Sequence, residues 1–446
     1  MLMQVAINDT NEYNSVSRNK QTNYTLPAVF HLIKRNVIMI KPELLSPAGD
    51  LEKLKVAFAF GADAVYMGSS VLGMRAAAKN FSLEEMEEGI NYAHSLGKKV
   101  YITVNIFAHN DDFIGMEEYF IQLEKMKADA LIISDFGIFE LARKTIPGIP
   151  IHISTQTSST NYHSVNFWKN LGAKRVVLAR ELSINEISQI VTKADGIEIE
   201  TFVHGAMCMA YSGRCIISNY MNHRDANRGH CSHPCRWQYT MTEEKSGQSL
   251  PVFEDDKGTY IFSSKDLCMI QHIPALVKAG IGSFKIEGRM KTSHYVAAVT
   301  KTYREAIDDY FNDPLLYESK KAYYLDELYK THHREFTTGF YFGPVSHEDY
   351  FYQGDEGQLQ TQDFLAIADS YDARSGICSV IQRNKFDAGD RIEILRSSGK
   401  NHIQKIKVLY DKDGNKIDSA PHPKEIIKFK VEVPVAKFDI VRKVRG

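Results

Sequence analysis

The sequence lacks three features that would place it in a specialised class of protein. It contains no uninterrupted apolar run near the ~20 residues that a membrane-spanning helix requires, so we expect no membrane segment. Its six cysteines in 446 residues are too few for a disulfide scaffold. The formal charge of −1 excludes a uniformly basic nucleic-acid binder but allows local charged patches. The remaining composition, 43% hydrophobic and 24% charged, is typical of a folded globular protein.

The first 38 residues also lack the patterning of a folded domain. They are rich in Asn, Thr and Ser, and they show neither a basic start nor an apolar core, so they do not resemble a signal peptide. We expect a disordered extension over residues 1–38 and an ordered chain from Met39, which would be the true start. We also expect a cytoplasmic protein whose thiols stay reduced.

From residue 42 onward, short β-rich runs alternate with segments whose apolar residues have helical spacing. The runs lie at residues 43–47, 64–68, 99–105, 130–134, 151–155, 175–179, 198–203 and 284–287. Eight strand–helix units in about 250 residues predict an α/β fold, a TIM-type (β/α)8 barrel over residues 39–311. An open doubly wound sheet is the alternative. Its nucleotide-binding versions lose support because neither GxGxxG nor GxxxxGK[ST] follows the first run.

In a TIM barrel, functional side chains lie at the carboxyl ends of the strands. The polar residues at these ends predict a pocket for a polar, anionic small molecule. The predicted catalytic residues are His204, Asn105, Gln156 and Glu287. The predicted anion-binding residues are arginines, because a guanidinium pairs with a carboxylate through two hydrogen bonds; they are Arg75, Arg180 and Arg289.

A loop over residues 205–262, after the seventh run, contains four of the six cysteines, namely Cys208, Cys215, Cys231 and Cys235. Their spacing is C-x6-C-x15-C-x3-C, in a loop with little apolar periodicity to bury them. Four thiols in one irregular loop predict a metal site. Zinc sites usually contain C-x2-4-C pairs, whereas iron–sulfur spacings vary more, so the spacing leaves both open with iron–sulfur favoured.

The last third of the chain has a different sequence pattern. We expect a helical connector over residues 312–361 and a small antiparallel β-barrel domain over residues 362–446, with a hairpin turn at Asp413-Gly414. Residues 376–446 carry a net charge of +7, so the rest of the chain carries −8. Such asymmetry is found in nucleic-acid-binding proteins and equally in exposed β domains with solvated lysines. The candidate phosphate contacts are Lys405, Lys407, Lys428, Lys430, Arg442 and Lys443, together with Arg445.

At this point a resemblance is visible. Residues 200–218, ETFVHGAMCMAYSGRCIIS, resemble the signature of the collagenase-like peptidase family of unassigned catalytic type. The similarity extends over ELLSPAGD, DANRGHCSHPCRW and FKIEGRMKTSHYVAAV, and it covers roughly residues 42 to 446. Within that family the chain most resembles the branch that takes part in prephenate-dependent 5-hydroxylation of the wobble uridine of tRNA.

The resemblance implies a cofactor and partners. Relatives that hydroxylate ubiquinone and ribosomal RNA cytidine bind a [4Fe–4S] cluster through four such cysteines, which correspond to Cys208, Cys215, Cys231 and Cys235. It therefore favours iron–sulfur over zinc, prephenate (a small dicarboxylate) as co-substrate, the tRNA anticodon stem-loop as partner, and loading by iron–sulfur assembly proteins. With the tRNA resemblance added, we favour RNA docking by the basic C-terminal domain.

Two other functions remain as alternatives. The family name implies a collagenase-like peptidase, but the sequence contains neither GxSxG nor HExxH. If the four loop cysteines bind a cluster, Cys268 remains as a thiol nucleophile, without an evident histidine partner in the sequence. The second alternative is a zinc-containing RNA-binding factor without catalytic activity. Cys268 and Cys378 are most simply buried small hydrophobic residues.

Overall fold

The structure is a computed structural model of the whole chain. It describes residues 40–69, 80–208, 210–236, 264–345 and 359–444, and four two-residue strands between 241 and 259. The expected extension over residues 1–38 lies outside the described residues. Among the helices that are described, none is both long and apolar enough to cross a membrane.

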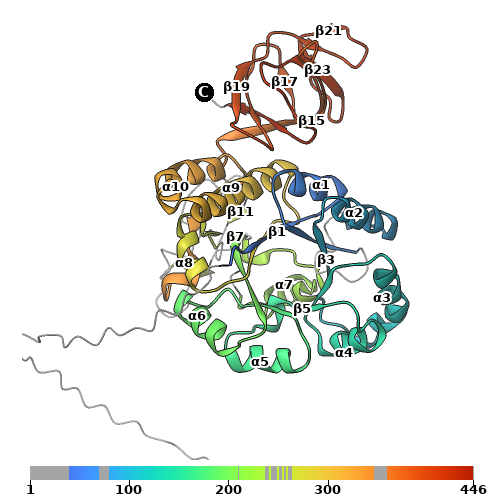
Figure 1. Cartoon of the computed structure of the whole chain (residues 1–446), viewed down its shortest axis with the longest axis vertical. Helices are drawn as coiled ribbons and strands as arrows, with labels where there is room; N and C mark the ends of the chain where they lie inside the picture. Colours follow the sequence, from blue (N-terminus) through green and yellow to red (C-terminus); the bar gives the residue numbers. More distant parts are fainter. Residues whose placement is uncertain are drawn as a thin grey trace, which may run out of the picture. The chain divides into compact units, whose positions relative to one another are not determined.

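Eight parallel strands close into a barrel, as predicted (Figure 1). The strands are β1 (Glu43–Pro47), β2 (Ala64–Gly68), β3 (Lys99–Val104), β4 (Ala130–Ile133), β5 (Ile151–Ile153), β6 (Arg175–Val177), β7 (Glu198–Ala206) and β13 (Ser283–Ile286). The last strand pairs with both β7 and β1, since Ser283 is opposite Glu200 on one side and Glu43 on the other. This closure confirms the barrel and excludes the open doubly wound sheet.

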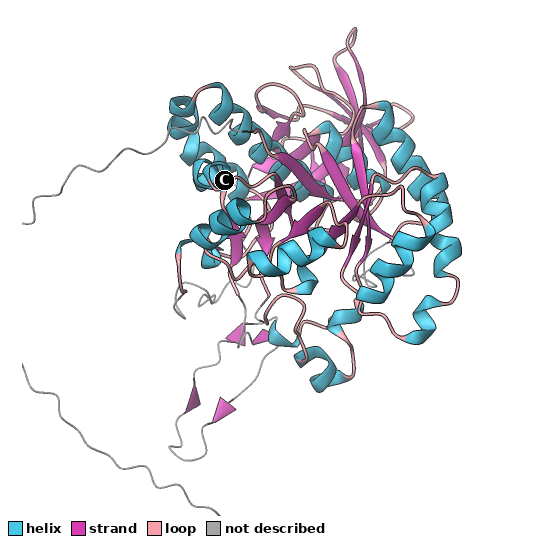
Figure 2. Cartoon of the chain, turned by 60° about the horizontal axis from the view of Figure 1, so that its bottom comes forward, coloured by secondary structure: helices cyan, strands magenta, loops and turns pink. Residues whose placement is uncertain are grey.

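Helices cover the outside of the barrel strands (Figures 1 and 2). They are α1 (Leu51–Ala59), α2 (Leu83–Ser95), α3 (Met116–Lys125), α4 (Phe136–Thr145), α5 (Tyr162–Asn170), α6 (Ile184–Lys193), α8 (Ile273–Lys278) and α9 (Ser293–Asn312). Side-chain caps set where several of them begin, as when Ser82 and Glu85 form a capping box. Gly61, Gly97 and Gly172 follow helices with φ of +99°, +66° and +98°, a conformation that favours glycine.

The chain between β7 and β13 departs from the simple strand–helix alternation. It contains α7 (Ile217–Asn222), the 3-10 turns η3 (Ala226–Arg228) and η4 (Pro234–Arg236), and the short strands β8 (Met241–Thr242), β9 (Ser249–Leu250), β10 (Glu254–Asp255) and β11 (Gly258–Thr259). Strand β12 (Asp266–Cys268) then returns antiparallel to β7 and pairs with β14 (Phe336–Thr337). The cysteine loop is therefore an insertion at the carboxyl end of β7.

The lower part of the barrel interior holds a buried charge network. The Glu200 carboxylate is fully buried, and it lies 2.8 Å from the Lys285 ammonium and 2.8 Å from the Arg175 guanidinium. Arg175 also bonds Glu43 at 2.7 Å and Glu198 at 2.8 Å. Burial alone would raise the pKa of Glu200, but Lys285 and Arg175 lower it to about 2. The paired charges close the barrel below the carboxyl ends of the strands.

The C-terminal region is an antiparallel sheet in the order β19-β18-β24-β15-β16-β23-β20-β21. It follows α10 (Pro314–Tyr329), and its strands are β15 (Gln362–Asp372), β16 (Ile377–Gln382), β18 (Arg391–Leu395), β19 (His402–Lys405), β20 (Leu409–Tyr410), β21 (Lys416–Ile417), β23 (Ile426–Lys430) and β24 (Ile440–Val444). Two more strands of this region, β17 (Phe386–Asp387) and β22 (Ser419–Ala420), form a separate antiparallel pair. The predicted turn is confirmed, since β20 and β21 pair across Asp413-Gly414 and Gly414 has φ +90°. The small all-β region is thus confirmed as an antiparallel fold.

We predict that Glu200→Gln lowers the free energy of unfolding by about 3 to 5 kcal/mol, because it removes the anion between two buried cations. Glu198→Gln is the matched control: Glu198 pairs with the same Arg175, but its side chain is 41% exposed, so we expect a loss of about 1 kcal/mol or less. Urea unfolding measures both. Equal losses for the two variants would contradict a structural role for the buried carboxylate.

The same network predicts a pH dependence. The pKa of Glu200 is lowered from 4.5 to about 2, so its contribution to stability is present above pH 4.5 and is lost as the pH falls toward 2. The stability difference between wild type and Glu200→Gln should therefore shrink over this range. A difference that stays constant from pH 6 to pH 2 would show that folding does not lower the pKa of this carboxyl group.

Candidate active site at the carboxyl end of the barrel

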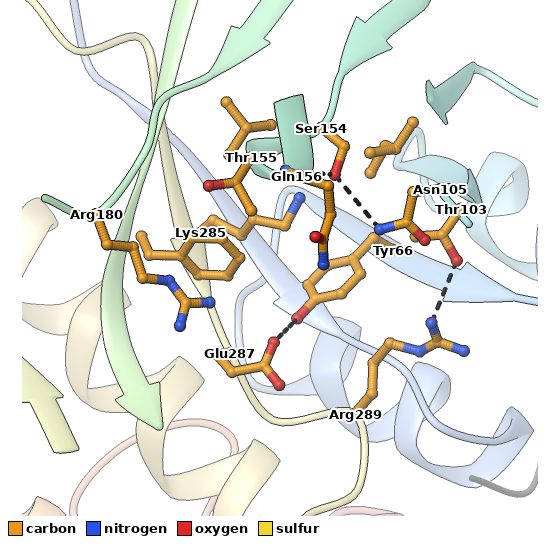
Figure 3. A pocket seen from close by; sticks show the side chains of 13 residues that line it. Tyr66, Thr103, Asn105, Ser154, Thr155, Gln156, Arg180, Lys285, Glu287 and Arg289 are labelled. Atoms are coloured by element: carbon orange, nitrogen blue, oxygen red, sulfur yellow. Dashed lines mark hydrogen bonds between the residues drawn. The ribbon is translucent and has the colours of Figure 1, made fainter. Parts of the chain in front are cut away.

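A small open cavity lies at the carboxyl ends of the barrel strands (Figure 3). Five of the predicted site residues line it, namely Asn105, Gln156, Arg180, Glu287 and Arg289. The cavity also contains polar residues that sequence reasoning missed, namely Tyr66, Thr103, Ser154, Thr155 and Lys285. The strand ends therefore converge on one site, as the barrel topology requires. The catalytic and binding roles assigned to these residues remain predictions.

Arg180 and Arg289 give the cavity two guanidinium groups. Arg180 donates to the Ala206 carbonyl at 2.8 Å, and its guanidinium lies 3.9 Å from the centroid of the Phe202 ring. Arg289 donates to Thr103 Oγ1 at 3.2 Å. Figure 3 shows the two groups on either side of Glu287. Their separation on opposite walls suits an anion with two carboxylates better than a single one.

Small residues make room for Arg289. A Cβ atom on Gly68 would lie 2.5 Å from Arg289 Nη2 and 2.7 Å from Thr103 Oγ1. A side chain at the end of β2 would therefore displace the guanidinium from the cavity wall. The close approach explains why glycine ends this strand.

Glu287 is held by its neighbours in the fold. The Tyr66 hydroxyl lies 2.9 Å from the Ile286 carbonyl and 3.2 Å from Glu287 Oε2. The Glu287 amide donates to the His204 carbonyl at 2.9 Å. At Gly205, which has φ +107°, a Cβ atom would lie 2.6 Å from the Glu287 carbonyl oxygen. These contacts place one carboxylate on the cavity wall with a phenol beside it.

Two amide oxygens in the cavity lack partners. Asn105 donates to Ser154 Oγ at 3.4 Å, but Asn105 Oδ1 and Gln156 Oε1 are buried without a hydrogen-bond partner among the described residues. Buried acceptors left unpaired are costly, and they are found where a ligand completes the hydrogen bonds. The cavity therefore offers two acceptors to the N–H or O–H groups of a substrate.

Lys285 contributes the cation at the base of the cavity. Its ammonium lies 2.8 Å from Glu200 Oε1 and 4.5 Å from the centroid of the Tyr66 ring. Sequence reasoning missed it because it considered strand ends, whereas Lys285 lies within β13. A lysine between two apolar residues of a barrel strand, Phe284 and Ile286, is the signal that could have identified it.

His204 does not face the cavity, so that prediction was wrong. The side chain is 1% exposed and packs near the rings of Tyr295, Tyr303 and Phe336. The register between β7 and β13 shifts at this point: Lys285 is paired with Phe202, but Ile286 is paired with His204, where a regular register would place Val203. This irregularity changes the face to which His204 points. Burial lowers its pKa to about 3, and the imidazole is neutral. Arg75 lies outside the described residues.

The cysteine loop is anchored to the loops around the cavity. Arg228 bonds Asp112 through two contacts of 2.6 and 2.9 Å, and its hydrogen bond lowers the pKa of that carboxyl. The Ser212 amide donates to Glu181 at 2.8 Å, beyond β6. Gly213 packs so closely on η2 (Thr155–Thr157) that a Cβ atom would lie 2.2 Å from the Gln156 carbonyl oxygen. In the view of Figure 1, α7 of this loop overlaps the barrel strands.

Of the four loop cysteines, Cys208 is exposed, and Cys215, Cys231 and Cys235 are half-buried. Asn227 Nδ2 donates to the Cys215 carbonyl at 2.8 Å, which ties one of them to the anchored turn η3. Within the described part of the chain, no three cysteine, histidine or carboxylate side chains are gathered around one point as metal ligands. The chemistry of the donors, four cysteines in one loop, still fits a cluster or zinc.

The other two cysteines are buried, as predicted. Cys268 is 7% exposed and Cys378 is 1% exposed. Burial raises the pKa of each thiol to about 12. A reactive cysteine needs the opposite shift, because the thiolate is the nucleophile.

The basic C-terminal residues differ in their availability. Lys405, Lys407 and Lys430 are exposed, whereas Lys428 donates to the Lys412 carbonyl and Lys443 pairs with Asp390 at 2.7 Å. Arg442 was wrongly predicted to contact phosphate. It is fully buried and bonds Glu327 at 2.7 Å and Glu393 at 3.1 Å, because β24 lies between β18 and β15 in the sheet. Arg445 lies outside the described residues.

Comparison with known proteins places the chain among RNA-modifying relatives. The chain is 42% identical over 409 residues to "tRNA hydroxylation protein P1" of Bacillus subtilis, covering 92% of this chain and 96% of that protein. It is 39% identical over 408 residues to "tRNA hydroxylation protein P" of Escherichia coli, covering 81% and 87%. It is 40% identical over 266 residues to the "23S rRNA 5-hydroxycytidine C2501 synthase" of Escherichia coli, covering 60% and 39%.

Among solved structures, the crystal structure of the C-terminal domain of a protein described as a U32 peptidase from Geobacillus thermoleovorans is 38% identical. It covers 19% of this chain and 93% of its own, with a TM-score of 0.18. Residues 49–350 match Peptidase family U32, and residues 360–442 match the Peptidase family U32 C-terminal domain. The chain therefore belongs to peptidase family U32, which confirms the resemblance seen in its sequence.

Proposed function

We propose that the chain is an RNA-modifying hydroxylase that acts on the wobble uridine of tRNA at carbon 5, with prephenate as co-substrate and hydroxyl donor. The names of the relatives support RNA base hydroxylation. The observation that carries the proposal is the composition of the cavity: two guanidinium groups on opposite walls, one carboxylate, and two unpaired amide oxygens, beneath a loop with four cysteines.

The co-substrate would bind through its two carboxylates. Arg180 and Arg289 supply the two fork-shaped donors that such an anion requires. Lys285 adds little net attraction because Glu200 already neutralises it at 2.8 Å. The cavity thus favours a dicarboxylate that spans its width over a single carboxylate at its base.

The uracil base would be recognised by the amide side chains. Its N3–H group can donate to Asn105 Oδ1 or Gln156 Oε1, and its carbonyls can accept from the amide nitrogens. Bases in the anticodon loop are only partly stacked, so extruding one into the cavity costs little. Glu287, held beside Tyr66, is the side chain that can accept a proton from the base. The exposed Lys405, Lys407 and Lys430 remain candidate contacts to phosphate.

The four loop thiols would hold the cofactor, which we propose is a [4Fe–4S] cluster with zinc as the alternative. When bound, a cluster supplies electron transfer or Lewis acidity at the mouth of the cavity. The protein contributes the thiols Cys208, Cys215, Cys231 and Cys235 and the anchors that keep their loop over the barrel. Iron–sulfur assembly proteins would load it.

The peptidase alternative is less well supported by the geometry. Cys268, the thiol outside the loop within the barrel, is buried with a raised pKa, and His204 near it is neutral and buried. This is the reverse of an activated cysteine–histidine pair. The third alternative, an RNA-binding factor with zinc, shares the thiols and is separated by metal analysis.

We predict that Arg180→Gln weakens prephenate binding by roughly 10- to 100-fold, because a hydrogen-bonded charge is lost from the cavity. Arg143→Gln is the matched control, since Arg143 is exposed on α4 outside the cavity and its loss should change affinity less than twofold. Calorimetric titration of the purified protein with prephenate measures both. Unchanged affinity in Arg180→Gln would remove this arginine from the binding site.

We predict that protein purified without oxygen contains iron and acid-labile sulfide, and that Cys215→Ser loses both. Cys378→Ser is the matched control, because this thiol is buried in the C-terminal sheet and should leave the metal content unchanged. Elemental analysis with sulfide determination gives the answer. Zinc without sulfide would support the RNA-binding alternative, and protein without metal that degrades peptides would support the peptidase.

The function itself is tested by nucleoside mass spectrometry of tRNA. A strain lacking this protein should lose 5-hydroxyuridine derivatives at the wobble position, and the wild-type chain should restore them. Glu287→Gln should fail to restore them while remaining folded. Unchanged 5-hydroxyuridine derivatives in the deletion strain would refute the proposal.

A further inference from the structure

A second cavity lies on the outer rim of the barrel, near the carboxyl ends of β4 and β5. It is open to solvent, and it is formed by the start of α4, the segment after β5, and α5. We call it the aromatic groove; its lining residues are Phe136, Phe167, Trp168, Thr157, Ser159, His163 and Ser164. The proposed hydroxylation does not use any of them.

The groove presents an aromatic surface that is open on one side. The Phe136 ring is stacked on Trp168, with centroids 4.9 Å apart and planes at 19°, and Phe136 remains 63% exposed. Phe167 meets Trp168 edge-on at 5.5 Å and is 51% exposed. Trp168 itself is 4% exposed and also contacts Phe139, so it is anchored in the barrel's outer core. The stack therefore has a fixed base and an accessible outer face.

The remaining walls are polar but carry no permanent charge. Hydroxyls come from Thr157, Ser159 and Ser164, and an imidazole comes from His163. Among the described residues that line the groove there is no aspartate, glutamate, lysine or arginine. Such a lining matches a flat, neutral ring with hydrogen-bonding edges, which describes a nucleobase, and it does not match a phosphate or a charged peptide.

The groove and the central cavity lie on either side of one short segment. Thr155 and Gln156 line the central cavity, and Thr157, the next residue of η2, lines the groove. A turn of the cysteine loop rests on this segment, because Ser158 Oγ donates to the Ser212 carbonyl. Arg214, in the same turn, is exposed and therefore accessible to a phosphate beside the segment.

We propose that the aromatic groove binds a base of the RNA that flanks the target base, by stacking it on Phe136. The inference rests on the proposed function, because it takes single-stranded RNA as the ligand. The target base enters the central cavity, the chain passes over η2, and the flanking base lies on the exposed ring. Stacking of this kind accepts any base, so the groove holds the strand in place without reading its sequence.

The test is a binding cycle with short single-stranded RNA. The first probe is a seven-nucleotide RNA with a central uridine. The other probes are four versions of this RNA, each with a single abasic site at one of the two positions before or the two positions after the uridine. Stacking is worth ~1–3 kcal/mol per base, so Phe136→Ala should weaken binding of the intact RNA by about 5-fold or more. For one flanking position, the abasic RNA should bind the wild type as weakly as the intact RNA binds Phe136→Ala. The affinity of this abasic RNA should not fall further in Phe136→Ala.

Two further variants keep the test sharp. Phe136→Trp retains a stacking surface and should restore affinity for the intact RNA. Phe342→Ala is the matched control, because Phe342 is 53% exposed and packs on His272 away from the groove, and its loss should leave affinity unchanged. Thermal unfolding of each variant verifies that Trp168 remains packed.

Three results would overturn the inference. They are unchanged affinity in Phe136→Ala, an equal loss for intact and all abasic RNAs, and a dimer in sedimentation that Phe136→Ala dissociates, which would assign the groove to a second copy of the chain. The binding cycle involves no turnover, so it is independent of hydroxylation. If Phe136→Ala and the abasic site weaken binding additively while the protein still hydroxylates uridine, the inference about the groove is refuted and the proposed function is not. If the two changes are non-additive but no hydroxylated uridine is formed, the proposed function is refuted and the groove is not.

Discussion

The candidate active site depends on one buried carboxylate. Glu200 is fully enclosed in the barrel, and it is stable there because Lys285 and Arg175 each contact it at 2.8 Å. An isolated charge at this depth would be too costly to bury. Paired, the three groups fill the lower barrel and hold the Lys285 ammonium against the Tyr66 and Phe202 rings at the base of the cavity. The polar side chains at the strand ends therefore surround a cavity with a rigid base of paired charges.

Above that base, the loops contribute the charged side chains and the cysteines. The walls carry Arg180, Arg289 and Glu287, each fixed by contacts to backbone or to neighbouring side chains. The cysteine loop is tied down by Arg228 to Asp112 and by Ser212 to Glu181, on different barrel loops. A cofactor in this loop would thus be held by the same structural elements that shape the cavity. This shared anchoring is consistent with a site in which cofactor, small anion and base act together.

Much of this arrangement follows from the sequence, because barrel topology brings all strand ends to one edge. Asn105, Gln156 and Glu287 follow strands whose positions the alternating pattern predicts, and the structure brings them together. Lys285 was missed since its inward orientation depends on barrel register. His204 was misplaced because a register shift between β7 and β13 turns it outward, which no local pattern reveals.

Tertiary packing also determines which C-terminal cations are exposed and which residues form the aromatic groove. From the sequence alone, Arg442 is expected to be one more exposed cation in a basic segment. In the structure it lies on a central strand and pairs with Glu327. The aromatic groove combines residues from α4, α5 and the segment after β5, and only the fold brings them together. Charge counts and residue spacing are properties of the sequence. They do not show which side chains are buried by a neighbouring helix or strand.

The most direct measurement is a reaction of purified, anaerobically prepared protein with an unmodified tRNA anticodon stem-loop and prephenate whose ring hydroxyl carries a heavy oxygen isotope. Mass spectrometry of the digested RNA then reports the mass of the wobble nucleoside. The proposed function predicts 5-hydroxyuridine that contains the heavy isotope. An unmodified wobble uridine, or a hydroxylated one without the isotope, would contradict the transfer of a hydroxyl group from prephenate to RNA at this site.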